Sequence, residues 1–278
     1  MRIDSHQHYW KLSRGDYGWL TSELDPIYRD FGPADLAPML ERHNIDGTVA
    51  VQAAPTVAET EYLLGLADAH ESVLGVVGWA DFEAGDAADQ IAGMAGHNAL
   101  LGLRPMIQDL SDDEWITRPD LDAAFGAVAK ADLVFDALVL PRHLGPLLKR
   151  MERTPGLRVV VDHAAKPHIA DGTLDPWRDS IARIASETNA VCKLSGMVTE
   201  AGDNWSVESL KPYSDHLLDT FGPSRLLWGS DWPVCTLAAT YSEWMAATDS
   251  LLSGLSKSEH AAVMGENAAR VYGLEIAA

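Results

Sequence analysis

Cysteine is scarce in this chain, which contains two, Cys192 and Cys235. Two cysteines do not make a disulfide framework, and these are not spaced as a CxxC pair, so we expect packed thiols without redox or thiolate–metal chemistry. Long apolar runs are missing too: no segment approaches the roughly 20 residues of a membrane-spanning helix, and the first residues lack the apolar core of a secretory signal. We therefore expect a soluble, cytoplasmic protein.

Basic residues are also few. The chain has 21 Lys and Arg against 41 Asp and Glu, which gives a formal net charge of −20. Such a surface repels phosphate backbones and anionic lipids, so we expect no nucleic-acid partner and no membrane partner. An anionic substrate would need locally placed Arg or Lys. Composition leaves a homo-oligomer open.

Apolar residues are plentiful, at 47% of the 278 residues, which is ample for one continuous core. The length is close to the roughly 250 residues of a typical eight-fold βα barrel, so we expect one domain over residues 1–278. Short apolar runs rich in β-branched residues recur eight times. They cover residues 2–8, 47–53, 73–80, 100–106, 133–139, 157–163, 190–195 and 225–231.

Segments with helical patterning separate most of these runs, at residues 58–71, 87–97, 121–131, 143–154, 177–187 and 207–221. Eight strand–helix units favour an α/β fold of the closed (β/α)8 TIM-barrel type over an open doubly wound sheet. Residues 12–35 look like a long irregular loop. Residues 258–272 are expected to form a last helix, with Ser258 as N-cap and Gly273 as the C-terminal stop.

Two histidines, His6 and His8, lie two positions apart in the first run, so both imidazoles should project to the same side of the sheet. The eighth run ends at Asp231, and strand eight adjoins strand one in a closed barrel. The three side chains can therefore meet at the carboxyl-terminal rim, where two His and one carboxylate suit a cation such as Zn²⁺. The alternative for Asp231 is that it caps the following helix.

Ionisable residues end two further runs. His163 can act as another metal ligand or as a donor that polarises a carbonyl group, and Arg104 can hold a substrate oxygen in a two-pronged contact. A buried hydrogen-bonded histidine and a structural ion pair are the respective alternatives. Weaker candidates for substrate contact are Gln52, Lys166 and Lys193. Tryptophans in the expected βα loops could hold a ring-shaped ligand: Trp10, Trp19, Trp115, Trp205 and Trp232.

Three motifs, DSHQH at residues 4–8, DHAAKP at 162–167 and WGSDWP at 228–233, resemble those of the amidohydrolase superfamily. They are most similar to its amidohydrolase-2 branch, in the sugar-lactonase subgroup that includes L-fucono-1,5-lactonase and L-rhamnonolactonase. The resemblance implies a (β/α)8 barrel with one divalent metal, expected to be Zn²⁺, at His6, His8 and Asp231; some members work without it. It also implies that His163 and Arg104 face the substrate.

One departure from the superfamily pattern concerns strand four. Members with two metals usually carry a bridging carboxylated Lys at its end, where this chain has Arg104 followed by Pro105, so a binuclear site is not expected.

The expected activity is hydrolysis of a sugar-derived lactone by attack of water on the ring carbonyl. Asp231, His163 and Arg104 are the catalytic candidates, and Gln52, Arg104, Lys166, Trp10 and Trp232 are the substrate-binding candidates. The motifs also fit a non-oxidative decarboxylase of the same branch, or a hydrolase of non-sugar lactones from aromatic catabolism. A scaffold protein with a degraded site is the non-enzyme alternative.

Overall fold

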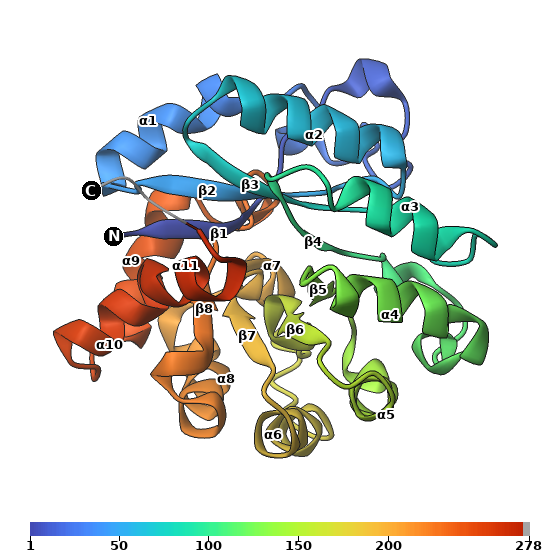
Figure 1. Cartoon of the computed structure of the whole chain (residues 1–278). Helices are drawn as coiled ribbons and strands as arrows, with labels where there is room; N and C mark the ends of the chain where they lie inside the picture. Colours follow the sequence, from blue (N-terminus) through green and yellow to red (C-terminus); the bar gives the residue numbers. More distant parts are fainter. Residues whose placement is uncertain (275–278) are drawn as a thin grey trace.

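Eight parallel strands form the centre of the protein in a computed structural model that describes residues 1–274 (Figure 1). The strands follow one another around the sheet in chain order, which confirms the expected (β/α)8 barrel. All eight expected runs contain a strand, each shorter than the run. The strands are β1 (Ile3–Gln7), β2 (Gly47–Val51), β3 (Val73–Gly78), β4 (Leu100–Leu103), β5 (Val134–Ala137), β6 (Arg158–Val161), β7 (Val191–Leu194) and β8 (Leu226–Trp228).

The barrel closes just beyond the end of β8. Asp231 N donates to His6 O at 2.8 Å, and His8 N donates to Trp232 O at 2.7 Å. Gln7 and Trp232 form a parallel bridge. These contacts join the first and last strands at the carboxyl-terminal rim, so two motifs far apart in sequence become adjacent.

Helices surround the strands (Figure 1). The six expected between the strands are present, as α2 (Val57–Ala69), α3 (Ala87–Met94), α4 (Asp122–Lys130), α5 (Leu144–Arg153), α6 (Trp177–Glu187) and α8 (Val207–Phe221). Helices α1 (Pro33–His43), α7 (Met197–Ala201) and α9 (Tyr241–Leu251) were not expected, and α1 begins inside the segment taken as loop. Within the described residues, no helix combines the length and apolar character needed to span a membrane.

The last helical segment differs from the expectation at its start. Ser256, not Ser258, is the N-cap, because Ser256 and Glu259 form a reciprocal capping box. The segment consists of α10 (Lys257–Ala261), a π-helical turn (Ala262–Glu266) and α11 (Asn267–Tyr272). Gly273 ends it in the left-handed region, as expected.

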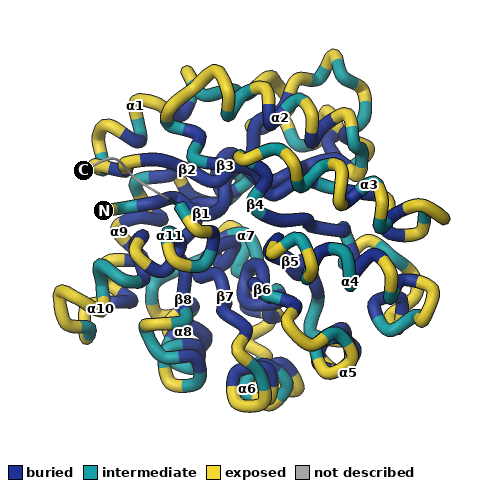
Figure 2. Tube along the Cα trace, in the orientation of Figure 1, coloured by how far each residue is buried: buried dark blue, intermediate teal, exposed yellow. Residues whose placement is uncertain are grey.

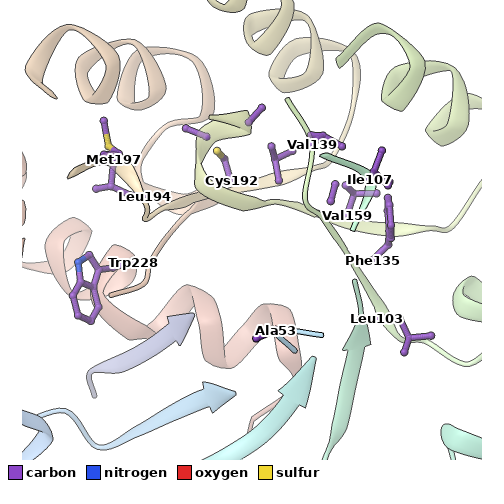
Figure 3. Close-up of a cluster of buried hydrophobic side chains, with 14 of the residues drawn as sticks. Ala53, Leu103, Ile107, Phe135, Val139, Val159, Cys192, Leu194, Met197 and Trp228 are labelled. Atoms are coloured by element: carbon purple, nitrogen blue, oxygen red, sulfur yellow. The ribbon is translucent and has the colours of Figure 1, made fainter. Parts of the chain in front are cut away.

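Alternate strand residues build two apolar layers. Phe135, Cys192 and Trp228, labelled in Figure 3, belong to the larger cluster. Phe135 packs edge-on against Phe125 of α4, and Trp228 Nε1 donates to Thr248 Oγ1 of α9. The neighbours of these three residues in the strands form a smaller cluster, which α11 covers with Ala268 and Tyr272. Figure 2 shows the strands buried and the outer sides of the helices exposed. The barrel is therefore a packed core, and its carboxyl-terminal rim carries the polar residues.

Candidate active site

Three imidazoles converge on one carboxylate oxygen. Asp231 Oδ1 lies 3.3 Å from His8 Nε2, 3.8 Å from His6 Nε2 and 3.9 Å from His163 Nε2. All four side chains are buried. Since β1, β6 and β8 end at the same rim, the structure brings together the residues that the sequence placed there.

Unusual backbone conformations present two of these side chains. Residues 163 to 166 have φ values of 50°, 54°, 58° and 50°, and Asp231 has φ of 58°. Left-handed backbone is costly for residues other than glycine and is found where tertiary contacts hold it, often at functional sites. Here Trp177 Nε1 donates to Ala164 O at 2.6 Å and helps to hold the turn.

Two glycines make room for the imidazoles. A Cβ on Gly229 would lie 2.6 Å from His6 Cβ, and a Cβ on Gly196 would lie 2.6 Å from His163 Nδ1. Gly196 also has φ of +66°. Larger residues at either position would displace a site histidine.

His8 has a defined hydrogen position. Its Nδ1 lies 2.7 Å from Val51 O. A carbonyl oxygen can only accept, so Nδ1 carries a hydrogen, and Nε2 is the ring atom that faces the Asp231 carboxylate. At a distance of 3.3 Å, a proton or a cation between Nε2 and the carboxylate oxygen would stabilise the pair.

A network of buried charged side chains inside the barrel contacts the His6 ring. Lys193 Nζ lies 3.1 Å from His6 Nδ1, 2.5 Å from Asp136 Oδ2 and 3.1 Å from Asp162 Oδ1. Asp162 Oδ1 is also 3.4 Å from His6 Nδ1. Burial and the Lys193 charge lower the pKa of His6 well below its usual value, so its imidazole is neutral. Asp162 and Lys193 therefore orient the ring.

His163 is tied to β7. Its Nδ1 lies 2.9 Å from Ser195 Oγ, and burial lowers its pKa to about 4. If Ser195 accepts from Nδ1–H, Nε2 presents a lone pair suited to a metal. If Ser195 donates instead, Nε2–H can donate to a carbonyl oxygen. Sequence reasoning did not single out Ser195, although it directly follows a strand.

Asp231 is ionised. Burial alone would raise its pKa, but interactions with His163, His8 and His6 lower it below the ordinary value for Asp. A carboxylate in this state can accept a proton or bind a cation.

Arg104 lies against the same group. Its Nη1 is 3.3 Å from His6 Nε2 and 3.5 Å from Asp162 Oδ2. Its Nη2 donates to Gln52 O, while Gln52 Nε2 donates to Arg104 O at 2.6 Å. Gln52 is fully buried, so it positions Arg104 and does not line the cavity.

A metal would find donors here. His6, His163 and Asp231 each offer an atom, and the three atoms lie within 4.8 Å of one another. Two imidazoles and a carboxylate with open positions match the donor set that Zn²⁺ takes in catalytic sites, so the residues fit the group. The sequence predicted His6, His8 and Asp231 as the metal ligands, whereas this set contains His163 in place of His8. His8 Nε2 also faces the shared Asp231 oxygen.

A small cavity of about 170 Å³ opens over these residues. Lys166 lines it, paired with Glu200 at 3.3 Å. Its wall contains His8, Trp19, Ala53, Arg104, Met106, Gln108, Asp109, Leu138, His163, Lys166, Asp231 and Val234.

Two predicted substrate contacts lie behind this wall. Trp10 and Trp232 are 0% and 2% exposed, and neither lines the cavity. Both pack edge-on against Phe31, with ring centroids 5.4 and 5.1 Å apart. Trp10 also packs edge-on against Trp19 at 5.6 Å. Trp10 therefore supports Trp19, which does line the wall, while Trp232 supports Phe31.

The family is decided by comparison with known proteins. The sequence model of the amidohydrolase family Amidohydro_2 matches residues 3–274, which is nearly the whole chain. The chain belongs to this amidohydrolase family. The resemblance seen in the three motifs is thereby confirmed.

Curated relatives of this amidohydrolase include two L-fucono-1,5-lactonases. The one from Burkholderia ambifaria is 45% identical over 99% of this chain and 96% of its own length. The one from Burkholderia multivorans is 37% identical over the same shares of the two chains. A crystal structure of a B. multivorans amidohydrolase with bound Zn superposes with a TM-score of 0.92 at 37% identity, covering 99% of this chain and 100% of that one.

Proposed function

We propose that this amidohydrolase hydrolyses a sugar-derived lactone, of which L-fucono-1,5-lactone is the leading candidate. The observation that carries the proposal is the ionised Asp231 in contact range of three imidazoles beside Arg104. A carboxylate base and a fixed cation are what addition of water to a carbonyl requires. The 45% identity to an L-fucono-1,5-lactonase supports the choice of a lactone.

The reaction needs one proton to be moved twice. Asp231 takes a proton from the attacking water as the water oxygen bonds to the ring carbonyl carbon. The guanidinium group of Arg104 stabilises the negative charge on the carbonyl oxygen. When the bond from carbon to the ring oxygen breaks, Asp231 returns the proton to that oxygen. The product is an open-chain hydroxy acid, and Asp231 is ionised again.

Zinc fits beside these residues. His6, His163 and Asp231 would hold it, with His8 adjacent. When bound, it would lower the pKa of a water toward about 7 and polarise the carbonyl group. Asp162 and Lys193 would keep His6 oriented toward it.

The test is acid release, followed with a pH indicator, from freshly prepared fucono-, galactono- and rhamnonolactones, with and without chelator. We expect rapid turnover in one stereochemical series and lower activity with chelator. Release of carbon dioxide from aromatic acids, with no lactone opened, would favour the decarboxylase alternative. If only lactones from aromatic catabolism were hydrolysed, the substrate would not be a sugar-derived lactone.

A further inference from the structure

A second cavity opens beside the catalytic one. Its volume is about 450 Å³, and it shares Trp19, Met106 and Asp109 with the catalytic cavity. The catalytic cavity, at about 170 Å³, lies below the roughly 300–1,000 Å³ usual for ligand pockets and suits one small ring. The second cavity is within that range. A ligand larger than one ring would therefore extend past Trp19.

Aromatic rings form much of the wall of the second cavity. Trp19, Trp79, Phe82 and Trp115 line it. Trp19 Nε1 donates to Ala53 O at 2.7 Å, which fixes this indole between the two cavities. Trp79 is half-buried and lines the second cavity without lining the first. Flat apolar faces of this kind pack well against the C–H face of a ring.

Polar groups of one sign complete the wall. Asp16, Asp81, Glu83 and Asp109 line the cavity, and none of its described lining residues is Lys, Arg or His. Asp16 pairs with Arg14 and Glu83 pairs with Arg118, each at 2.6 Å, while Asp81 and Asp109 form no ion pair among the described residues. These two carboxylates disfavour an anionic ligand and can accept hydrogen bonds from hydroxyl groups. Asp16 Oδ1 and Trp115 Nε1 are buried with no hydrogen-bond partner among the described residues. Other protein atoms cover both of these atoms, so the acceptors that a ligand hydroxyl group can reach include the exposed carboxylates of Asp81 and Asp109.

We propose that this aromatic cavity is a subsite for a second, uncharged sugar ring, so that the enzyme acts on lactones of glycosylated aldonic acids. The lactone ring would occupy the catalytic cavity, and its glycosyl substituent would pass Trp19 and stack near Trp79. The inference rests on the proposed function, because it takes the lactone as the reacting group. The unpaired carboxylates of Asp81 and Asp109 disfavour lactones that carry extra carboxylate or sulfonate groups.

The test compares L-fucono-1,5-lactone with the three derivatives that carry a galactosyl group at O2, O3 or O4. We expect at least one derivative to be hydrolysed with kcat/KM at least equal to that of the parent lactone. Trp79→Ala should lower that kcat/KM about tenfold, the effect of losing one stacked ring, and leave the parent value within about twofold. Trp79→Phe should recover most of the loss.

The matched control is Trp205→Ala, since Trp205 is also a partly buried loop tryptophan but lines neither cavity. Trp205→Ala should leave kcat/KM unchanged for both the parent lactone and the derivative. Failure of all three derivatives beside an active parent lactone would overturn the subsite and leave the proposed function intact. Equal losses for parent and derivative in Trp79→Ala would also overturn it.

If none of the fucono-, galactono- and rhamnonolactones is hydrolysed, the proposed function fails, and binding then tests the subsite alone. Methyl β-galactoside is titrated while tryptophan fluorescence is followed. Saturable quenching that Trp79→Ala removes and Trp205→Ala keeps would support a sugar site. No saturable signal in the wild-type protein would overturn it.

Discussion

Asp231 Oδ1 and His8 Nε2 lie 3.3 Å apart, although 223 residues separate them in the chain. The main-chain contacts that close the barrel hold them there, since Asp231 N bonds to His6 O and His8 N bonds to Trp232 O. The same main-chain contacts thus close the barrel and hold the reactive side chains together.

Replacing Asp231 by Asn tests its role as base and acid. The amide keeps the shape but cannot accept the proton of water, so we expect kcat to fall by at least about a thousandfold. Lactone hydrolysis is measured by acid release, and circular dichroism checks the fold. Normal kcat in a folded Asp231→Asn protein would remove this residue from the mechanism.

Zinc affinity separates the two candidate ligand sets. Calorimetric titration of metal-free protein should show one site per chain, weakened at least about tenfold by His163→Ala. His260→Ala is the control, because this partly buried histidine on α10 pairs with Asp249 and does not belong to the donor set. A larger loss in His8→Ala than in His163→Ala would restore the set expected from sequence. Unchanged affinity in both variants would place zinc elsewhere.

Gly229→Ala should damage both stability and activity. The new Cβ would lie 2.6 Å from His6 Cβ and 3.1 Å from His6 N, so the first strand must shift. Overpacking of this kind costs about 1–3 kcal/mol of unfolding free energy, and it displaces a site histidine. Urea unfolding and lactone turnover measure the two effects. Gly126→Ala in α4 has no atom within 4 Å of its added Cβ and should leave activity unchanged.

Glu59 should make stability depend on pH. It is buried at the start of α2, accepts from Ala53 N at 3.1 Å and also from Ala54 N, and burial raises its pKa from 4.5 to about 7. Between those values the unfolded chain releases the proton while the folded chain keeps it. The free energy of unfolding therefore falls as pH rises through this window, by about 3 kcal/mol at most.

Urea unfolding across that pH window tests the expectation. Glu59→Gln cannot ionise, so its stability should change less between the two values than that of the wild type. Glu61→Gln, an exposed position on the same helix, should keep the wild-type slope. An identical slope in Glu59→Gln and the wild type would mean that this carboxyl group titrates normally in the folded protein.

Local patterns in the sequence were enough for the architecture and for the centre of the site. Short apolar runs rich in β-branched residues predict the strands, and the period of two within a strand places His6 and His8 on one side. Parallel strands end at one rim, so His163, Arg104 and Asp231 could be assigned to it before any contact was known.

Only the tertiary structure decided how that rim is built. Asp136, Lys193 and Ser195 are polar residues within or directly after apolar strands, and their partners come from other strands. Trp10 and Trp232 could be assigned to loops but not to a packed layer behind the cavity wall, because burial depends on segments distant in the chain. Strand identity is encoded in short-range periodicity, whereas the depth of a side chain and its partner depend on register and closure around the whole barrel.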